Sequence, residues 1–311
     1  MAAADVLDTG VRISHADFGG RALRGWSAGC TPGEPAACSS GYLYEGVITE
    51  DESSTCSGHG THCASTIGGL TYGVSKDVTI ITVQVLSCGG SGSQASVLAG
   101  IEWAVENALQ RGKPAVLSMS LGGNGGGRYD QVIEQAFNQG VLTVVAAGNS
   151  NADACSYSPA SAPLAITVGA TTISDSKSSF SNYGSCVDIH APGSGITAAW
   201  VRSDVDTRTI SGTSMACPHV AGVASQIRAL RPSMTPAQIT EALLCLATSG
   251  VLLGLPSNTA NKMLYNGFNS ADAASCLGPA PPVDGCSIAE AGTFINAPWQ
   301  SPPRYVLQYA S

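Results

Sequence analysis

Residues 211–222 read SGTSMACPHVAG, and this stretch decides the fold. Small residues lead up to Ser214, and apolar residues then recur at helical spacing. They are Val220, Val223, Ala224, Ile227 and Leu230. We therefore expect Ser214 at the N-terminus of a long, buried helix, with Pro218 early enough in the helix to be tolerated. A serine in this place is either an N-cap or a nucleophile whose own backbone N–H faces a developing oxyanion.

A serine nucleophile needs a base and an orienting carboxylate, and the chain offers both. Residues 5–11 read DVLDTGV, which predicts a buried strand that ends at Asp8. Residues 58–64 read GHGTHCA, which predicts a helix that opens at His59. Each also has a plainer interpretation: Asp8 as an acid satisfied by turn backbone, and His59 with His62 as a metal-binding pair. Because no third His or Cys ligand stands at a recognisable spacing, we favour a structural role for His62.

The composition excludes several classes of function. Across 311 residues, 14 Lys and Arg against 22 Asp and Glu give a net charge of −8, which argues against nucleic-acid binding. No apolar run is long enough for a membrane span. Eleven cysteines without a C-x-x-C pair favour an oxidising compartment, although no signal peptide is visible in this chain.

Strand-like and helix-like segments alternate along the chain. Strands are expected at 78–86, 115–121, 141–147, 165–169 and 187–190, and helices at 93–110, at 129–138 and after the capping box at Thr235. This alternation predicts an α/β fold of three layers, a mainly parallel central sheet with helices on both faces. Residues 19–57 are expected to be rich in loops, and residues 268–311 to form a Pro-, Ala- and Ser-rich tail beyond a domain of residues 1–267.

A further candidate for the site is Asn149, which follows the predicted strand 141–147 and a glycine. The plain interpretation of Asn149 is a turn former. The functional interpretation is a side-chain amide that donates a hydrogen bond to an oxyanion.

Taken together, four stretches resemble the subtilase family, and most closely its proteinase K and aqualysin branch. They read LDTGV at 7–11, GHGTH at 58–62, AAGN at 146–149 and SGTSMA at 211–216, in the order Asp, His, Ser that subtilisin shows. The resemblance covers residues 5–267. It implies a serine endopeptidase that needs no catalytic cofactor, with Asp8 orienting His59, His59 acting as the base, Ser214 attacking, and Asn149 binding the oxyanion.

The resemblance also implies how a peptide binds. An extended substrate would add a strand between two stretches of exposed backbone, Gly90, Ser91 and Gly92 on one side and Ser120, Leu121 and Gly122 on the other. Ala146, Ala147 and Gly148 would line an uncharged pocket, so we expect broad specificity with an apolar or aromatic residue before the scissile bond. Proteins and peptides are the expected partners of a secreted monomer, and no nucleic acid or membrane is expected to bind.

Cysteine pairing and calcium are likewise implied by the resemblance. In the aqualysin branch the matching pairs are Cys56 with Cys88 and Cys155 with Cys186, and the branch often binds Ca²⁺ at positions that match Pro163, Ala165 and Asp188. The plain interpretation of Asp188 is an acid at a strand end, satisfied by backbone. Proximity in the sequence suggests two further pairs, Cys30 with Cys38 and Cys276 with Cys286. Cys63 and Cys217 lie on predicted buried helix faces and are expected to be free.

The chain departs from the family at its start. Only seven residues precede Asp8, and Asp5 places a charge where a buried strand prefers an apolar residue. Family members carry a signal, an inhibitory pro-region and a longer mature segment before this point, so we expect the sequence to be truncated. The alternative to an active protease is a catalytically silent, truncated subtilase fold that binds peptides.

Overall fold

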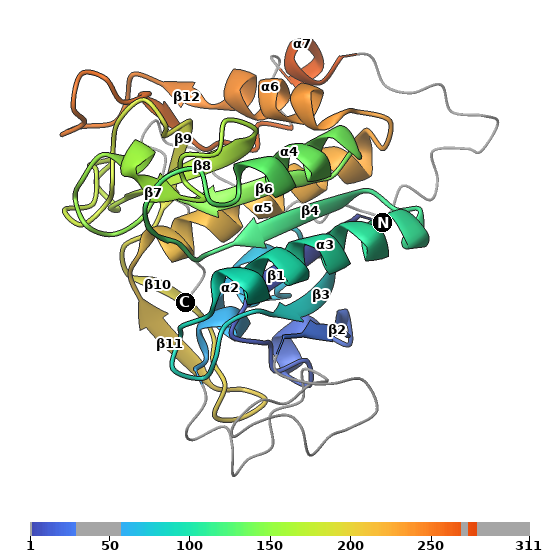
Figure 1. Ribbon diagram of the computed structural model, residues 1–311. Helices are drawn as coiled ribbons and strands as arrows, with labels where there is room; N and C mark the ends of the chain where they lie inside the picture. Colours follow the sequence, from blue (N-terminus) through green and yellow to red (C-terminus); the bar gives the residue numbers. More distant parts are fainter. Residues whose placement is uncertain (1, 29–56, 269–272, 279–311) are drawn as a thin grey trace.

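Nine strands form the central sheet of the protein, in a computed structural model that describes residues 2–28, 57–268 and 273–278 (Figure 1). Their order across the sheet is β12-β13-β9-β8-β6-β4-β1-β3-β2, and all neighbours are parallel except β12 and β13. The strands are β1 (Ala3–Asp8), β2 (Ala22–Ser27), β3 (Thr79–Gln84), β4 (Ala115–Met119), β6 (Leu142–Ala146), β8 (Ala165–Thr171), β9 (Ile189–Pro192), β12 (Thr248–Ser249) and β13 (Lys262–Met263).

Helices cover both faces of this sheet. One face packs against α2 (His59–Gly68) and α5 (Thr213–Leu230), and α6 (Pro236–Leu246) and α7 (Ala273–Leu277) extend the same core by packing on α5 and on each other. The other face packs against α3 (Gln94–Arg111) and α4 (Asp130–Asn138). Side chains alternate between the two cores along β1, so that Val6 packs on the first side and Leu7 on the second. The predicted three-layer α/β fold is confirmed.

Helix α5 is the long buried helix that residues 211–222 predict. It begins at Thr213, one residue before Ser214, and includes Pro218. It packs against β4, β6, β8 and β9 of the sheet and against α2. The predicted capping box at the start of α6 is also present, because the Thr235 hydroxyl accepts from the Gln238 N–H and the Gln238 side chain accepts from the Thr235 N–H.

The segments expected to be irregular contain regular structure. Within residues 19–57, expected to be rich in loops, residues 22–27 form β2, which pairs with β3 at the edge of the sheet. Two small antiparallel pairs were not predicted: β10 (Ile196–Ala199) with β11 (Thr207–Ile210), and β5 (Gly123–Asn124) with β7 (Tyr157–Ser158). The predicted tail begins with α7, whose Ala273 and Leu277 are buried against the domain.

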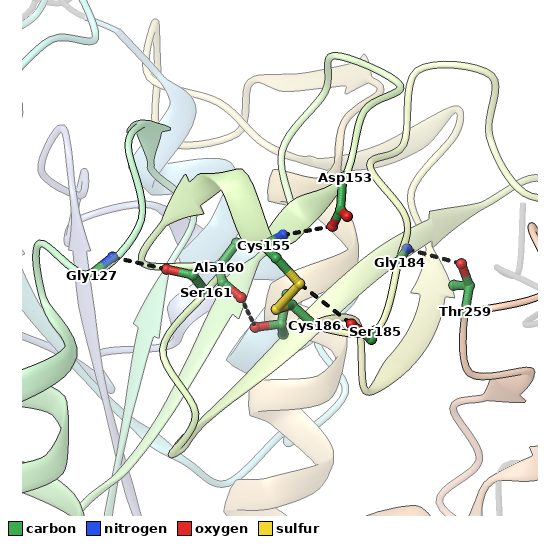
Figure 2. The surroundings of a disulfide bond; sticks show 10 residues. Gly127, Asp153, Cys155, Ala160, Ser161, Gly184, Ser185, Cys186 and Thr259 are labelled. Carbon is green, nitrogen blue, oxygen red and sulfur yellow. Dashed lines mark hydrogen bonds between the residues drawn. A yellow bond between two sulfur atoms is a disulfide. The ribbon is translucent and has the colours of Figure 1, made fainter.

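Two disulfides lie wholly within the described residues. Cys155 pairs with Cys186, which confirms that prediction (Figure 2). Cys276 pairs with Cys245, so its predicted pairing with Cys286 is wrong. Proximity in the sequence misled here, because α6 and α7 pack side by side and bring Cys245 to Cys276 across 31 residues.

The other cysteine predictions have mixed outcomes. Cys63 and Cys217 are free and buried, as expected. Cys88 takes part in a disulfide, but its predicted partner Cys56 lies outside the described residues, as do Cys30 and Cys38, so these pairings stay predictions. Among the described residues, no helix combines the length and apolar character that a membrane span requires.

Candidate active site

The predicted site residues meet at one edge of the sheet. Asp8 ends β1, while residues 90–92 follow β3, residues 120–122 follow β4, and Gly148 and Asn149 follow β6. These four strands are neighbours in the order β6-β4-β1-β3, and parallel strands bring their carboxyl ends to the same edge. The N-termini of α2 and α5 add His59 and Ser214 at this edge.

Asp8 and His59 form the closest contact of the site. The His59 Nδ1 lies 2.8 Å from Asp8 Oδ1 and 3.0 Å from Asp8 Oδ2. Asp8 is fully buried and its Oδ1 also accepts the Thr9 N–H at 2.7 Å, which fixes the carboxylate. A methyl group at Gly60 would clash with the Gly10 carbonyl, so glycine at this position lets α2 approach the turn after β1.

The environment of His59 favours its protonated form. Burial of the ring is the largest single influence and lowers the pKa of His59, but the charge and hydrogen bond of Asp8, together with the contribution of Cys63, outweigh burial and hold that pKa well above its ordinary value. The neighbouring Cys63 thiol lies 3.9 Å from His59 Nδ1, and burial raises the pKa of this thiol. Cys63 therefore stays a neutral neighbour of the imidazole.

Ser214 is placed by contacts with the end of β4. Its Oγ donates to the Ser120 carbonyl at 3.2 Å, and the Ser120 Oγ donates in return to the Ser214 carbonyl at 2.8 Å. Within the described residues, Ser214 Oγ and His59 Nε2 form no hydrogen bond. A nucleophile and its base often lie loosely before substrate binds, so this geometry is compatible with a Ser–His pair.

The orientation of Asn149 is set by the residue before Ser214. Asn149 Oδ1 accepts the Thr213 N–H at 2.8 Å and the Thr213 hydroxyl at 3.0 Å. With Oδ1 engaged, the Asn149 Nδ2 has no partner among the described residues and remains a donor on an exposed side chain. The Thr213 hydroxyl in turn accepts the Gly148 N–H at 3.1 Å, which ties the β6 end to α5.

The predicted substrate segments differ in exposure. Residues 90–92 and Gly122 are exposed, Leu121 is half-buried and Ser120 is buried. Ala146 and Ala147 are buried and Gly148 is half-buried. Ala147 packs in a small core with Ala154, Ala160 and Val187, against which Cys186 of the Cys155–Cys186 disulfide also packs. Because its side chains are small and mostly buried, segment 146–148 offers mainly backbone atoms to a bound peptide.

His62 does not take part in a metal pair with His59. Its Nε2 donates a shared hydrogen bond to the carbonyls of Ile196 and Arg208, at 3.0 and 3.1 Å. These two contacts orient the ring toward β10 and β11. Burial lowers the pKa of His62 to about 4, so this side chain is a neutral structural residue. Asp8, His59 and Cys63 do have ligand atoms near one another, but the Asp8–His59 bond already uses His59 Nδ1.

The residues of the predicted calcium site lie at the starts of the neighbouring strands β8 and β9. Asp188 precedes β9, and its Oδ2 accepts the Thr167 N–H at 2.8 Å. Burial raises the pKa of Asp188 to about 6, and no described Lys or Arg forms an ion pair with it. Pro163 is exposed and Ala165 begins β8.

Sequence reasoning missed two residues that hold the site. Ser120 appeared only as peptide-binding backbone, yet its side chain bonds Ser214. Thr213 appeared only as part of a motif, yet it holds both Asn149 and Gly148. Their positions next to predicted site residues were the only signal that the sequence carried.

The family model described as the subtilase family matches residues 3–268. The chain belongs to the subtilase family. This subtilase is 49% identical over 263 residues to an extracellular serine proteinase of Thermus sp. (strain Rt41A), and 47% identical over 264 residues to a cuticle-degrading serine protease of Arthrobotrys oligospora. Each alignment covers 85% of this chain but only 59% and 60% of the two relatives. The chain thus spans about three fifths of their length.

A solved structure shows the same fold. The crystal structure of a cold-adapted subtilisin-like serine proteinase superposes with a TM-score of 0.74 at 45% identity, over 85% of this chain and 88% of that chain.

Proposed function

We propose that this subtilase is a serine endopeptidase that cleaves peptide bonds through Asp8, His59 and Ser214. The observation that carries the proposal is the meeting of these residues, with a free Asn149 amide donor, at the carboxyl edge of the sheet. The names of the relatives, serine proteinase and serine protease, support the same activity. The contact between Asp8 and His59 argues against a silent peptide-binding fold, because a degenerate site need not retain it.

In this mechanism, His59 takes the Ser214 proton as Ser214 Oγ attacks the peptide carbonyl carbon. The developing oxyanion accepts hydrogen bonds from Asn149 Nδ2 and the Ser214 N–H. The C–N bond then breaks, His59 gives its proton to the leaving amine, and water releases the acyl group by the reverse sequence. Asp8 keeps the His59 proton on Nδ1 and stabilises the imidazolium.

Substrate specificity follows from the uncharged surroundings of the site. The backbone of 90–92 and 120–122 would pair with an extended peptide, and 146–148 would accept an apolar or aromatic residue before the scissile bond. The disulfides, together with a Thermus relative named as extracellular, support secretion. Protein and peptide substrates are the partners that this activity requires.

The test of the proposed function is covalent labelling with a fluorescent fluorophosphonate, which reacts with an activated serine. Wild-type protein should label and should digest casein, and Ser214→Ala should do neither. Ser225→Ala is the matched control, because Ser225 lies in the same helix and its hydroxyl only donates to the Ala221 carbonyl. Labelling that persists in Ser214→Ala would contradict the assignment.

A calcium ion at Asp188 is a second part of the proposal. Asp188 fits a hard cation, because it is a half-buried carboxylate without a cationic partner among the described residues, and its Oδ2 contacts the backbone of β8 at the Thr167 N–H. When bound, the ion would supply positive charge that offsets the burial of this carboxylate. Pro163 and Ala165 would add carbonyl ligands.

The calcium proposal is tested by thermal unfolding with and without EDTA. EDTA should lower the melting temperature of wild-type protein, and Asp188→Asn should remove this response. Asp77→Asn changes an exposed acid and is the control. A melting temperature that does not respond to EDTA would rule the site out.

A further inference from the structure

A cation that the mechanism does not use lies near His59. The hairpin of β10 and β11 packs on α2, the helix that begins with His59 (Figure 1). Trp200 follows β10, and its half-buried ring lies against Gly58, where an added methyl group would clash with the ring. The indole therefore contacts the residue directly before His59.

The Arg208 side chain packs over the face of the Trp200 ring. The carbon Cζ of its guanidinium lies 4.8 Å from the centroid of the Trp200 ring, a cation–π contact that holds an otherwise flexible side chain. Its backbone is fixed as well, because the Arg208 carbonyl accepts from His62 Nε2 at 3.1 Å. The Arg208 side chain is exposed.

Arg208 has no carboxylate partner among the described residues. The loop of the hairpin carries two acids: Asp204 is bound by Arg12 Nε and the Ser14 hydroxyl, both at 2.7 Å, and Asp206 forms no ion pair with Arg208. His62 is neutral, since its pKa is lowered to about 4. In a chain of net charge −8, an exposed guanidinium that has no counter-ion within residues 2–28, 57–268 and 273–278 is available to a substrate.

The position of the hairpin assigns it to one side of the substrate. The segments 90–92 and 120–122, proposed to bind the acyl part, follow β3 and β4. The leaving amine departs at His59, which protonates it. Trp200 contacts Gly58, the residue before His59, and the hairpin packs on the helix that His59 begins, so both lie on the leaving-group side. Strand β11 ends at Ile210, four residues before Ser214, so the hairpin also adjoins the nucleophile.

We propose that Arg208, held on Trp200, binds a carboxylate on the leaving-group side of the substrate. The carboxylate would be an acidic side chain just after the scissile bond or the free C-terminus of a short peptide. A guanidinium suits either, because its planar fork can donate two parallel hydrogen bonds to one carboxylate. This inference rests on the proposed endopeptidase function and adds to it a preference on the leaving-group side.

The test measures kcat/KM on internally quenched peptide amides with one fixed aromatic residue before the cleaved bond. Each of the three positions after that bond carries Glu in one peptide and Gln in its matched partner, one position at a time. One further Gln peptide ends after these three positions in a free carboxylate instead of an amide. For wild-type protein, a carboxylate in at least one arm should raise kcat/KM by about three- to tenfold, as expected for an exposed charge pair. The arm that responds distinguishes a side chain from a C-terminus.

The variants assign this preference to Arg208. Arg208→Gln should remove the preference, Arg208→Glu should reverse it, and Arg202→Gln, an exposed arginine of the same hairpin, should keep it. All variants should still label with fluorophosphonate and cleave the neutral Gln peptide, which shows that they fold. The proposal is overturned if wild-type protein shows no preference in any arm, or if Arg208→Gln retains the preference. Failure of wild-type protein to label would instead overturn the proposed function, and this site with it.

Discussion

Strand β1 carries two buried aspartates, Asp5 in its middle and Asp8 at its end, and the two have different partners. Both are fully buried. Because they are three residues apart, they point to opposite faces of the sheet. Asp5 binds Arg111 Nη2 at the end of α3, at 3.0 Å from Oδ1 and 2.9 Å from Oδ2, and Asp8 binds His59 at the start of α2.

The comparison shows how position and partner decide what a buried carboxylate does. Asp8 lies where the strand ends, so the Thr9 N–H also bonds it, and its partner His59 can gain and lose a proton. Asp5 has only Arg111 among the described side chains, and burial raises the pKa of Asp5 to about 6 although Arg111 opposes the shift. We infer that one pair serves chemistry and the other serves structure.

The largest expected effect is on the Asp8 pair. Asp8→Asn should lower kcat by about 10⁴-fold, because an amide cannot hold the His59 proton on Nδ1. The Asn side chain can still accept the Thr9 N–H, so the melting temperature should change little. Kinetics on a chromogenic peptide and a melting curve check both statements. A loss of less than tenfold would show that Asp8 is not the orienting group.

The corresponding change at the other pair should affect stability and not chemistry. Arg111→Met leaves the Asp5 carboxylate buried without its partner, which should cost about 3–5 kcal/mol in the free energy of unfolding. Urea unfolding at pH 7 measures this loss, and Lys113→Met at an exposed neighbouring site is the control. The rate per folded, fluorophosphonate-labelled molecule should stay unchanged. A selective fall in that rate would mean that the two ends of β1 are coupled.

The pH dependence of stability should sharpen the difference. The pKa of Asp5 rises from 3.8 to about 6 on folding, so the folded state binds this proton more tightly. The stabilisation of the folded state by protonated Asp5 is fully present below about pH 4 and is lost as the pH rises through 6. The free energy of unfolding of wild-type protein, minus that of Asp5→Asn, should therefore grow by roughly 2–3 kcal/mol from pH 7 to pH 4. Glu102→Gln, an exposed site, should show no such trend.

The remaining prediction concerns the pH dependence of the rate. His59 acts as a base only when neutral, and its pKa is raised, so kcat/KM should climb about tenfold per pH unit below that pKa and level off above it. The expected optimum is accordingly alkaline. Asp5→Asn should leave this profile in place, since Asp5 faces away from His59. A profile already level at acidic pH would contradict the raised pKa.

The sequence alone predicted the local parts of this molecule well. The strand at Asp8, the helix starts at His59 and Ser214 and the capping box at Thr235 each depend on short-range patterns, and the structure contains all of them. Subtilase membership also followed from four short motifs. Residue order and hydrophobic spacing were sufficient in these cases because the signals lie within one element.

Contacts across the fold were beyond the sequence. Asp5 stood out as a charge in a buried strand, but nothing marked Arg111, 106 residues away, as its partner. Cys276 was paired with the nearer Cys286, whereas packing of α7 on α6 selects Cys245. The strand β2 is mixed in polarity and, among the described strands, pairs with β3 alone, so its sequence resembled a loop. Each of these contacts depends on tertiary packing that no local pattern encodes.

The depth of α5 has a consequence for inactivation by heat. Ser214 lies in the first turn of a helix whose body is buried against four strands and α2, so this helix cannot melt without opening the main core. Loss of the nucleophile and loss of the fold should therefore occur as one event on heating. The segment 90–92 is exposed and does not belong to this buried helix. It can therefore unfold locally while Ser214, His59 and Asp8 keep their positions.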